Sequence, residues 1–72
     1  MAIEMSIGEL FQTSDGTLER PRKCLVSRGI HTVGQLIELE EDDLLAIANF
    51  GQKSLDVVRE RLANFDLELK GG

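Results

Sequence analysis

Apolar residues recur at helical spacing in the C-terminal third of the chain. The repeat consists of Leu55, Val58, Leu62 and Phe65. Successive steps of three, four and three residues place these side chains on one side of an α-helix. The repeat therefore predicts a helix from about Gln52 to Asn64, the longest element of the chain. After it, Leu67 and Leu69 are expected to fold back onto the domain as a tail.

A capping box predicts a short helix near the N-terminus. Ser6 and Glu9 have the S-x-x-E spacing, in which the side chain of each residue bonds the backbone N–H of the other. Apolar residues follow at helical spacing and predict a helix from about Ile7 to Gln12. Phe11 would anchor this segment over the core, and the polar residues 13–16 would end it in a turn.

The next helical segment lies between Thr17 and Arg28. Its apolar positions are Leu18, Cys24, Leu25 and Val26. Gly29 is suited to the residue after the helix, where a positive φ is common. Pro21 complicates the start, because proline disfavours helical angles in the residue before it. The sequence therefore predicts a helix that begins at Pro21 and leaves Arg20 on its cap.

Two more short helices are expected in the middle of the chain. Thr32 and Gln35 form a T-x-x-Q capping box for a helix with Val33, Leu36 and Ile37 on its apolar side. The acidic run 40–43 then suits the positive end of another helix. The buried side of that helix would consist of Leu44, Leu45, Ile47 and Ala48.

The predicted fold class is all-α, a compact bundle of four to five short helices. The expected core consists of Leu25, Ile30, Val33, Leu36, Leu44, Ile47, Leu55, Val58 and Leu62. Residues 1–16 would form an N-terminal helix and turn packed on the domain. Residues 17–69 would form the domain itself, and residues 70–72 a flexible tail.

Composition narrows the function classes. The protein has 72 residues, a net charge of −5, one cysteine and one histidine. A single Cys24 and a single His31 can form neither a disulfide framework nor a Cys/His zinc site within one polypeptide, so we expect no metal and no cofactor. The sequence has no nucleophile–base pair and no carboxylate pair with a plausible water site, so we expect the domain to have no catalytic activity. No segment is typical of a membrane span or signal peptide, and we expect a soluble, cytoplasmic protein without membrane contact.

Charge is segregated along the sequence. Basic residues gather at Arg20, Arg22, Lys23 and Arg28, and acidic ones at Glu38 and residues 40–43. The net charge argues against indiscriminate coating of nucleic acid, which draws its affinity from many phosphate contacts. A local nucleic-acid site remains compatible with it. The acidic run is interpreted as a solvated helix start.

The segment from Ala48 to Leu55 carries the most specific chemistry. Gly51 is expected to make a tight turn with positive φ just before the last helix begins. The free backbone N–H groups of that helix start, together with Lys53 and Ser54, would form a small anion-binding nest suited to phosphate. The alternative interpretation is an ordinary glycine turn between two helices.

Two blocks of sequence, taken together, resemble a known family. The first block is G-I-H-T-V-G at residues 29–34, and the second is N-F-G-x-K-S-L at residues 49–55. With Cys24-Leu25 and Leu44-Leu45 around them, they are similar to the C-terminal domain of the bacterial RNA polymerase alpha subunit. The resemblance covers about Leu18 to Leu69. It implies a compact all-helical fold, related to helix-hairpin-helix modules, that grips the DNA minor groove upstream of promoters and contacts transcription activators.

The resemblance also implies which residues bind DNA. Carried over position by position, they are Arg20, Lys23, Cys24, Gly51, Lys53 and Ser54. Lys23 stands where the family has asparagine, and Pro21 where it usually has serine. The family's sigma-facing acidic residues are not transferred to Asp15 or Glu19, because the segment from Ser6 to Gly16 differs from the usual entry to this domain.

The expected partners are double-stranded DNA with an A/T-rich minor groove, RNA polymerase subunits, a sigma factor and transcription activators. Two other functions stay open from the sequence. A generic helix-hairpin-helix DNA-binding module would keep the nest at residues 51–54 without needing Arg20. A protein-interaction adaptor with this fold would have lost DNA binding, as the acidic charge, Pro21 and Lys23 allow.

Overall fold

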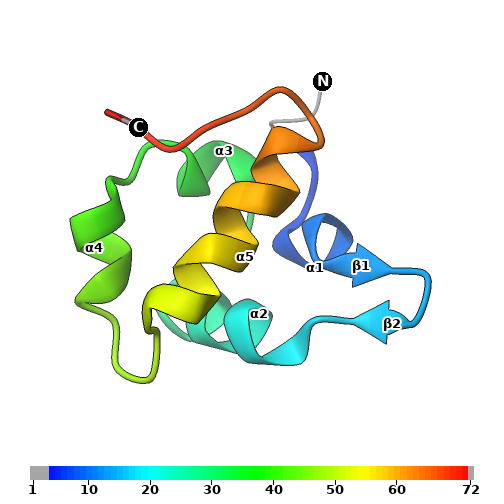
Figure 1. Cartoon of the computed structure of the whole chain (residues 1–72), viewed down its shortest axis with the longest axis horizontal. Coiled ribbons are helices and arrows are strands. Elements are labelled where there is room, and N and C mark those ends of the chain that lie inside the picture. Colours follow the sequence, from blue (N-terminus) through cyan, green and yellow to red (C-terminus); the bar gives the residue numbers. More distant parts are fainter. Residues whose placement is uncertain (1–3, 72) are drawn as a thin grey trace.

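A computed structural model describes residues 4–71 of the protein. The all-α prediction is confirmed, and these described residues form five helices in the order α1 to α5 and one small hairpin (Figure 1). The helices are α1 (Ile7–Leu10), α2 (Glu19–Ser27), α3 (Val33–Leu36), α4 (Glu41–Leu45) and α5 (Gln52–Ala63). Helix α5 crosses the front of the molecule in Figure 1, and the shorter helices surround it.

The N-terminal segment is held in place by its capping residue and by backbone bonds to a distant turn. The Ser6 hydroxyl accepts a hydrogen bond from the Glu9 N–H at 3.1 Å. The Ile7 N–H donates to the His31 carbonyl and the Val33 N–H to the Met5 carbonyl, both at 2.9 Å. Helix α1 ends at Leu10, earlier than predicted. The backbone then forms an antiparallel hairpin, β1 (Gln12–Thr13) with β2 (Gly16–Thr17), which the sequence pattern did not predict.

Helix α2 begins at Glu19, so the predicted start at Pro21 is wrong. Pro21 is the third residue of the helix, and its side chain is buried. The first-turn N–H groups of a helix have no acceptor within it, so proline at this position removes no hydrogen bond. Arg20 therefore lies inside the first turn. At the other end the predicted stop is confirmed, because Gly29 follows with a φ of 82°.

Helices α3 and α4 begin as predicted. The Thr32–Gln35 capping box is formed, with the Gln35 N–H donating to the Thr32 hydroxyl at 3.2 Å. The Asp43 carboxylate accepts from the Glu40 N–H at 2.9 Å at the start of α4. After α5 the backbone folds back as expected. Leu69 is buried, and the Lys70 N–H donates to the Leu39 carbonyl at 3.0 Å.

The core differs from the predicted one mainly by additions. Its buried apolar residues are Ile7, Leu10, Phe11, Leu25, Val33, Leu36, Leu44, Ile47, Phe50, Leu55, Val58, Leu62 and Leu69. Ile30 packs against this cluster but is only half-buried. Leu45, Ala48 and Phe65, which the pattern placed on apolar faces, are exposed. Helix α4 is too short to bury a wide face, and Phe65 lies beyond the end of α5, where the helical repeat no longer applies.

Candidate nucleic-acid interface

A hollow lies between the first turns of α2 and α5, and we call it the α2–α5 hollow. Its lining residues are Arg20, Pro21, Asn49, Gly51, Lys53, Ser54 and Val57, and its volume is about 290 Å³. Four of the six residues carried over from the family meet here, although more than 30 positions of sequence separate Arg20 from Gly51. Arg20 and Lys53 are both exposed at the hollow, so their charges are available to a ligand.

The turn before α5 is built differently from the prediction. Gly51 is the N-cap of α5 and has an extended backbone with a φ of −104°. The left-handed residue is Asn49, with a φ of 67°. Asparagine adopts this conformation more readily than most residues because its short polar side group can bond locally. Phe50 between them is buried and fixes the turn to the core.

Helix α5 starts without a side-chain cap. Gly51 has no side chain, so the N-cap residue makes no side-chain hydrogen bond to the first turn. The first backbone N–H groups of a helix have no partner within it, and the helix dipole adds a partial positive charge there. A Cβ atom added at Gly51 would meet nothing within 4 Å, so the space above this turn is open. Ser54, which is 9% exposed, lines the same opening. The helix start can accept an anion.

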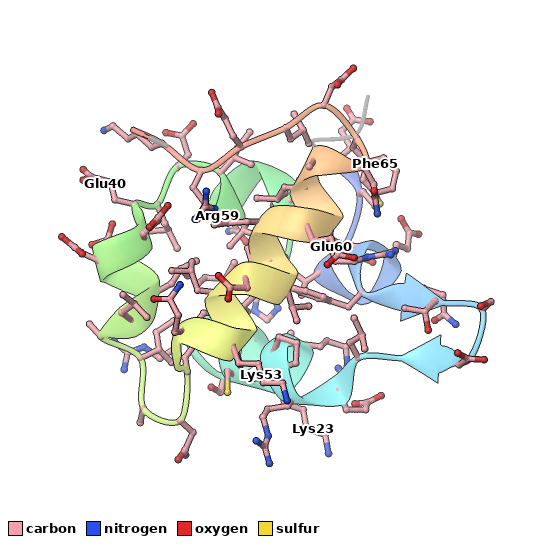
Figure 2. All side chains as sticks on the ribbon, viewed as in Figure 1. Lys23, Glu40, Lys53, Arg59, Glu60 and Phe65 are labelled. Atoms are coloured by element: carbon pink, nitrogen blue, oxygen red, sulfur yellow. The ribbon has the colours of Figure 1, made fainter. Side chains whose placement is uncertain are left out.

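The other two carried-over residues lie beside the hollow rather than in its lining. Lys23 is exposed, and Figure 2 shows its side chain and that of Lys53 at the same lower edge of the molecule. Cys24 is half-buried, with its Sγ atom 3.9 Å from the carbonyl oxygen of Asn49. Cys24 thus contacts the turn that precedes α5.

The basic residues that cluster between positions 20 and 28 of the sequence lie in three different surroundings in the structure. Arg22 pairs with Glu19 on its own helix, with Arg22 Nε donating to Glu19 Oε2 at 3.1 Å. That hydrogen bond and the charges of Arg22 and Lys23 lower the pKa of the exposed Glu19 carboxyl. Arg28 lies at the far end of α2 and lines a different hollow. Arg20 and Lys23 remain as the α2 cations available at the edge shared with Lys53.

The acidic run lies away from that edge. Figure 2 shows Glu40 at the start of α4, on the other side of the molecule from Lys23 and Lys53. Arg59 of α5 contacts the run, with its Nη1 atom 3.5 Å from Glu41 Oε2. The domain therefore has a basic edge and an acidic edge, and its negative net charge does not describe the surface at the α2–α5 hollow.

Three residues that line the hollow were not assigned to the site by the sequence reasoning. They are Pro21, Asn49 and Val57. Asn49 carried a usable signal, since asparagine two residues before glycine is a common turn residue. Pro21 and Val57 carried none, because apolar residues at helical positions are usually core.

Other kinds of site have no support in residues 4–71. Within this range no group of three or more His, Cys, Asp or Glu side chains is arranged to hold a metal ion. Over the same residues, every helix is too short or too polar to cross a membrane.

Comparison with known proteins identifies the family. Residues 19–64 match the family described as the C terminal domain of the bacterial RNA polymerase alpha chain. This protein belongs to that family. The matched range contains α2 to α5 and the whole α2–α5 hollow, so the resemblance predicted from the sequence is confirmed.

Similar proteins bear the names of polymerase subunits. The sequence is 55% identical over 51 residues to DNA-directed RNA polymerase subunit alpha of Cutibacterium acnes, a match that covers 71% of this chain and 15% of that protein. It is 50% identical over 52 residues to the subunit of Bifidobacterium longum, covering 72% of this chain and 16% of that protein. Thus the sequence spans only a small part of the length of these relatives. The N-terminal residues 4–18, with α1 and the hairpin, lie outside the family match.

Proposed function

We propose that this domain binds double-stranded DNA through the minor groove of A/T-rich sequence. The observation that carries the proposal is that Arg20, Lys53 and Ser54 surround one hollow, at the start of an uncapped helix. A narrow A-tract minor groove has an enhanced negative potential that attracts an inserted arginine. The N–H groups, Lys53 and Ser54 would hold the flanking phosphates. Arg20 would read the groove, and the start of α5 would fix the register.

Pro21 and Lys23 differ from the residues that the family usually has at these positions, and both are compatible with this role. Pro21 is buried in the first turn of α2, so it supports Arg20 within a regular helix instead of displacing it. Lys23 supplies a cation at the edge it shares with Lys53. A lysine is a compact point charge, suited to a phosphate, whereas an asparagine would offer a directional amide. Lysine in place of the family's asparagine at position 23 should therefore raise the affinity for phosphates of any DNA sequence.

The biological setting that we propose follows from the family. The domain would serve DNA-directed RNA polymerase in transcription, in the bacterial cytoplasm at the nucleoid, and would itself be non-catalytic. Its protein partners would be other polymerase subunits, a sigma factor and transcription activators. With few phosphate contacts the free domain should bind nonspecific DNA only weakly, at about 10⁻⁴ M or poorer. A flexible tether to a larger assembly would raise its effective concentration to roughly millimolar and make this affinity sufficient.

A mobility-shift assay on A-tract and mixed-sequence duplexes tests the proposal. We expect Arg20→Ala to lower both the affinity and the preference for the A-tract, because it removes the groove-inserted side chain. Lys53→Ala should weaken binding to both duplexes about equally and reduce the log–log salt slope by roughly 0.9, the value of one phosphate contact. Arg59→Ala is the matched control, since Arg59 is an exposed α5 cation that contacts Glu41 away from the hollow.

An amide chemical-shift titration with the A-tract duplex maps the interface independently. The amides of Arg20, Lys23, Gly51, Lys53 and Ser54 should move together, while those of the acidic run 40–43 stay unchanged. Equal affinity for both duplexes, with Arg20→Ala without effect, would favour a generic helix-hairpin-helix DNA-binding module. Absence of DNA binding would favour the protein-interaction adaptor, and either outcome would overturn minor-groove recognition by Arg20.

A further inference from the structure

A second hollow lies on another part of the surface, among the end of α2, α3 and α4, and we call it the α3–α4 hollow. Its lining residues are Arg28, Gly29, Ile30, Gln35, Leu39, Asp43, Ala46 and Ile47, and its volume is about 510 Å³. None of them lines the α2–α5 hollow. The apolar members Ile30 and Leu39 are half-buried, and Ile47 is 7% exposed. This surface offers an apolar floor that a side chain from outside could cover.

Among the described residues, the polar rim of the α3–α4 hollow combines one unpaired cation, Arg28, with two acceptor side chains that already have hydrogen-bond partners. The Arg28 side chain is exposed, and within residues 4–71 its guanidinium makes no hydrogen bond or ion pair. Gln35 Oε1 already accepts from the backbone N–H groups of His31 and Thr32, at 2.7 and 3.2 Å. Asp43 likewise accepts from the Glu40 N–H. The rim beside Arg28 therefore fits a partner that carries a carboxylate next to an apolar side chain.

The protein itself contains such a pair of residues. Leu45 and Phe65 are the large apolar side chains that remain exposed among the described residues, at 41% and 39%. Phe65 is followed directly by Asp66, whose backbone is left-handed with a φ of 59°. Leu45 has no carboxylate next to it in sequence and belongs to α4, beside the hollow itself. Phe65 and Asp66 are therefore the better match to an apolar floor with a free cation on its rim.

We propose that Phe65 and Asp66 of one copy of this domain dock into the α3–α4 hollow of a second copy, with Phe65 on the apolar floor and Asp66 beside Arg28. The two surfaces lie apart on one molecule, since Phe65 follows the end of α5 while α4 lies on the other side of that helix (Figures 1 and 2). The contact is therefore head to tail. It leaves the α2–α5 hollow uncovered, so neighbouring copies could touch while both face DNA.

The contact should be weak in free solution. One aromatic side chain and one exposed ion pair fall well short of a standard protein interface, and the net charge of −5 opposes association of identical molecules. A dissociation constant of roughly millimolar is the expected scale, which matters only when two copies are held near each other. The contact itself does not rest on the proposed function, although its use on DNA does.

Dilution of the labelled domain, followed by amide chemical shifts, tests the contact without DNA. Between about 0.05 and 2 mM, a range that brackets a millimolar constant, we expect two groups of amides to shift together. They are residues 28–30 with Leu39 and Ile47, and Phe65 with Asp66. Shifts that are absent, or that map instead to Leu45 or to the basic edge, would overturn the proposal.

A charge exchange makes the test specific. Arg28→Asp and Asp66→Lys should each weaken self-association about threefold to tenfold, because each places like charges at the rim. The double variant, and a mixture of the two single variants, should restore it. Asp66→Asn tolerates the left-handed backbone and should give a smaller loss in the same direction. Arg59→Asp makes the same change in charge at a residue outside both surfaces, so it should leave self-association unchanged. Failure of both restorations would overturn the pairing of Arg28 with Asp66.

Binding to duplexes with one and with two A-tracts one helical turn apart separates this proposal from the proposed function. The contact on DNA would be supported if the domain binds the single A-tract normally and binds the two A-tracts cooperatively, and if Phe65→Ala removes only the cooperativity. Intact single-site binding without cooperativity would overturn that use and leave the proposed function standing. Loss of single-site binding would instead contradict the proposed function, while the dilution experiment still decides whether the contact exists.

Discussion

The Sγ atom of Cys24 lies 3.9 Å from the carbonyl oxygen of Asn49, which joins the middle of α2 to the turn before α5. These two elements carry Arg20 on one side of the α2–α5 hollow and Lys53 on the other. Their relative position depends on the turn, and the turn depends on Asn49, the residue with the left-handed backbone.

Replacement of Asn49 tests this dependence. Asn49→Val should destabilise the domain by about 1–2 kcal/mol, because a β-branched side chain resists the left-handed conformation. Asn49→Gly should be close to neutral in stability, since glycine adopts that conformation without steric cost. Thermal melts of both variants measure the difference. Equal melting temperatures for the two variants would contradict a strained turn at position 49.

The sequence predicted the helices well because their signals are local. Capping at Ser6, the Thr32–Gln35 box and the repeat in α5 each specify hydrogen bonds or a buried face within a few residues. The start of α2 was mispredicted because the effect of proline on the residue before it was given too much weight. A first-turn proline lacks only an N–H that the helix would leave unbonded.

The parts of the site that depend on long-range packing were beyond sequence reasoning. The pattern could not indicate that Arg28 would line a second hollow, because the helix end and neighbouring segments decide this direction. The pair of Arg22 with Glu19 is local, three residues apart on one helix, and it was missed because the predicted helix began at Pro21 and left Glu19 outside. It also misplaced the positive φ, since glycine and asparagine in one turn can exchange that role. The meeting of Arg20 with Lys53 came from the family resemblance alone.

Core and surface apolar residues of the last helical repeat should respond differently to truncation. Leu55 is fully buried, so Leu55→Ala should destabilise the domain by about 2–5 kcal/mol through lost contacts and a cavity. Phe65 belongs to the same sequence repeat but is 39% exposed, and Phe65→Ala should cost much less. Chemical denaturation of both variants gives the comparison. Similar losses would mean that Phe65 belongs to the core after all.

Arg61 fastens the N-terminal segment to α5. Its Nε atom donates to the Leu10 carbonyl and its Nη2 atom to the Gln12 carbonyl, both at 2.8 Å. Arg61→Ala should therefore destabilise the domain by about 1–3 kcal/mol, because two charged hydrogen bonds are lost and the Leu10 carbonyl that accepts one of them is partly buried.

Arg59→Ala provides the control for Arg61, because it removes the same kind of side chain from the same helix. Arg59 is largely exposed and makes one surface ion pair with Glu41, so its loss should cost no more than about 1 kcal/mol. Denaturant midpoints of the two variants give the comparison. The Arg61 interpretation fails if the two variants are equally stable.

The pairing of Glu19 with Arg22 predicts a small dependence of stability on pH. The pKa of Glu19 is lowered in the folded domain by its hydrogen bond to Arg22, so folding favours the ionised carboxylate. Its contribution is present above the ordinary pKa of 4.5 and is lost as the pH falls through the lowered value. Glu19→Gln should thus be slightly less stable than the parent at pH 7, with the difference vanishing in acid and shrinking in high salt. A difference that grows in acid would contradict this sign.

Gly51 separates the needs of the fold from those of the proposed function. Its φ of −104° is open to any residue, and a Cβ would meet nothing within 4 Å, so the fold does not require glycine there. Serine is a better N-cap than glycine by a few tenths of a kcal/mol, because its hydroxyl accepts from a first-turn N–H. Gly51→Ser should therefore keep or slightly raise the melting temperature.

The same hydroxyl would occupy the N–H groups that we assign to a DNA phosphate, so DNA affinity should fall several-fold for A-tract and mixed duplexes alike. Gly51→Ala adds the Cβ without the hydroxyl and distinguishes steric exclusion from competition for the N–H groups. Undiminished DNA binding by Gly51→Ser, in a domain as stable as the parent, would mean that the start of α5 does not hold a phosphate.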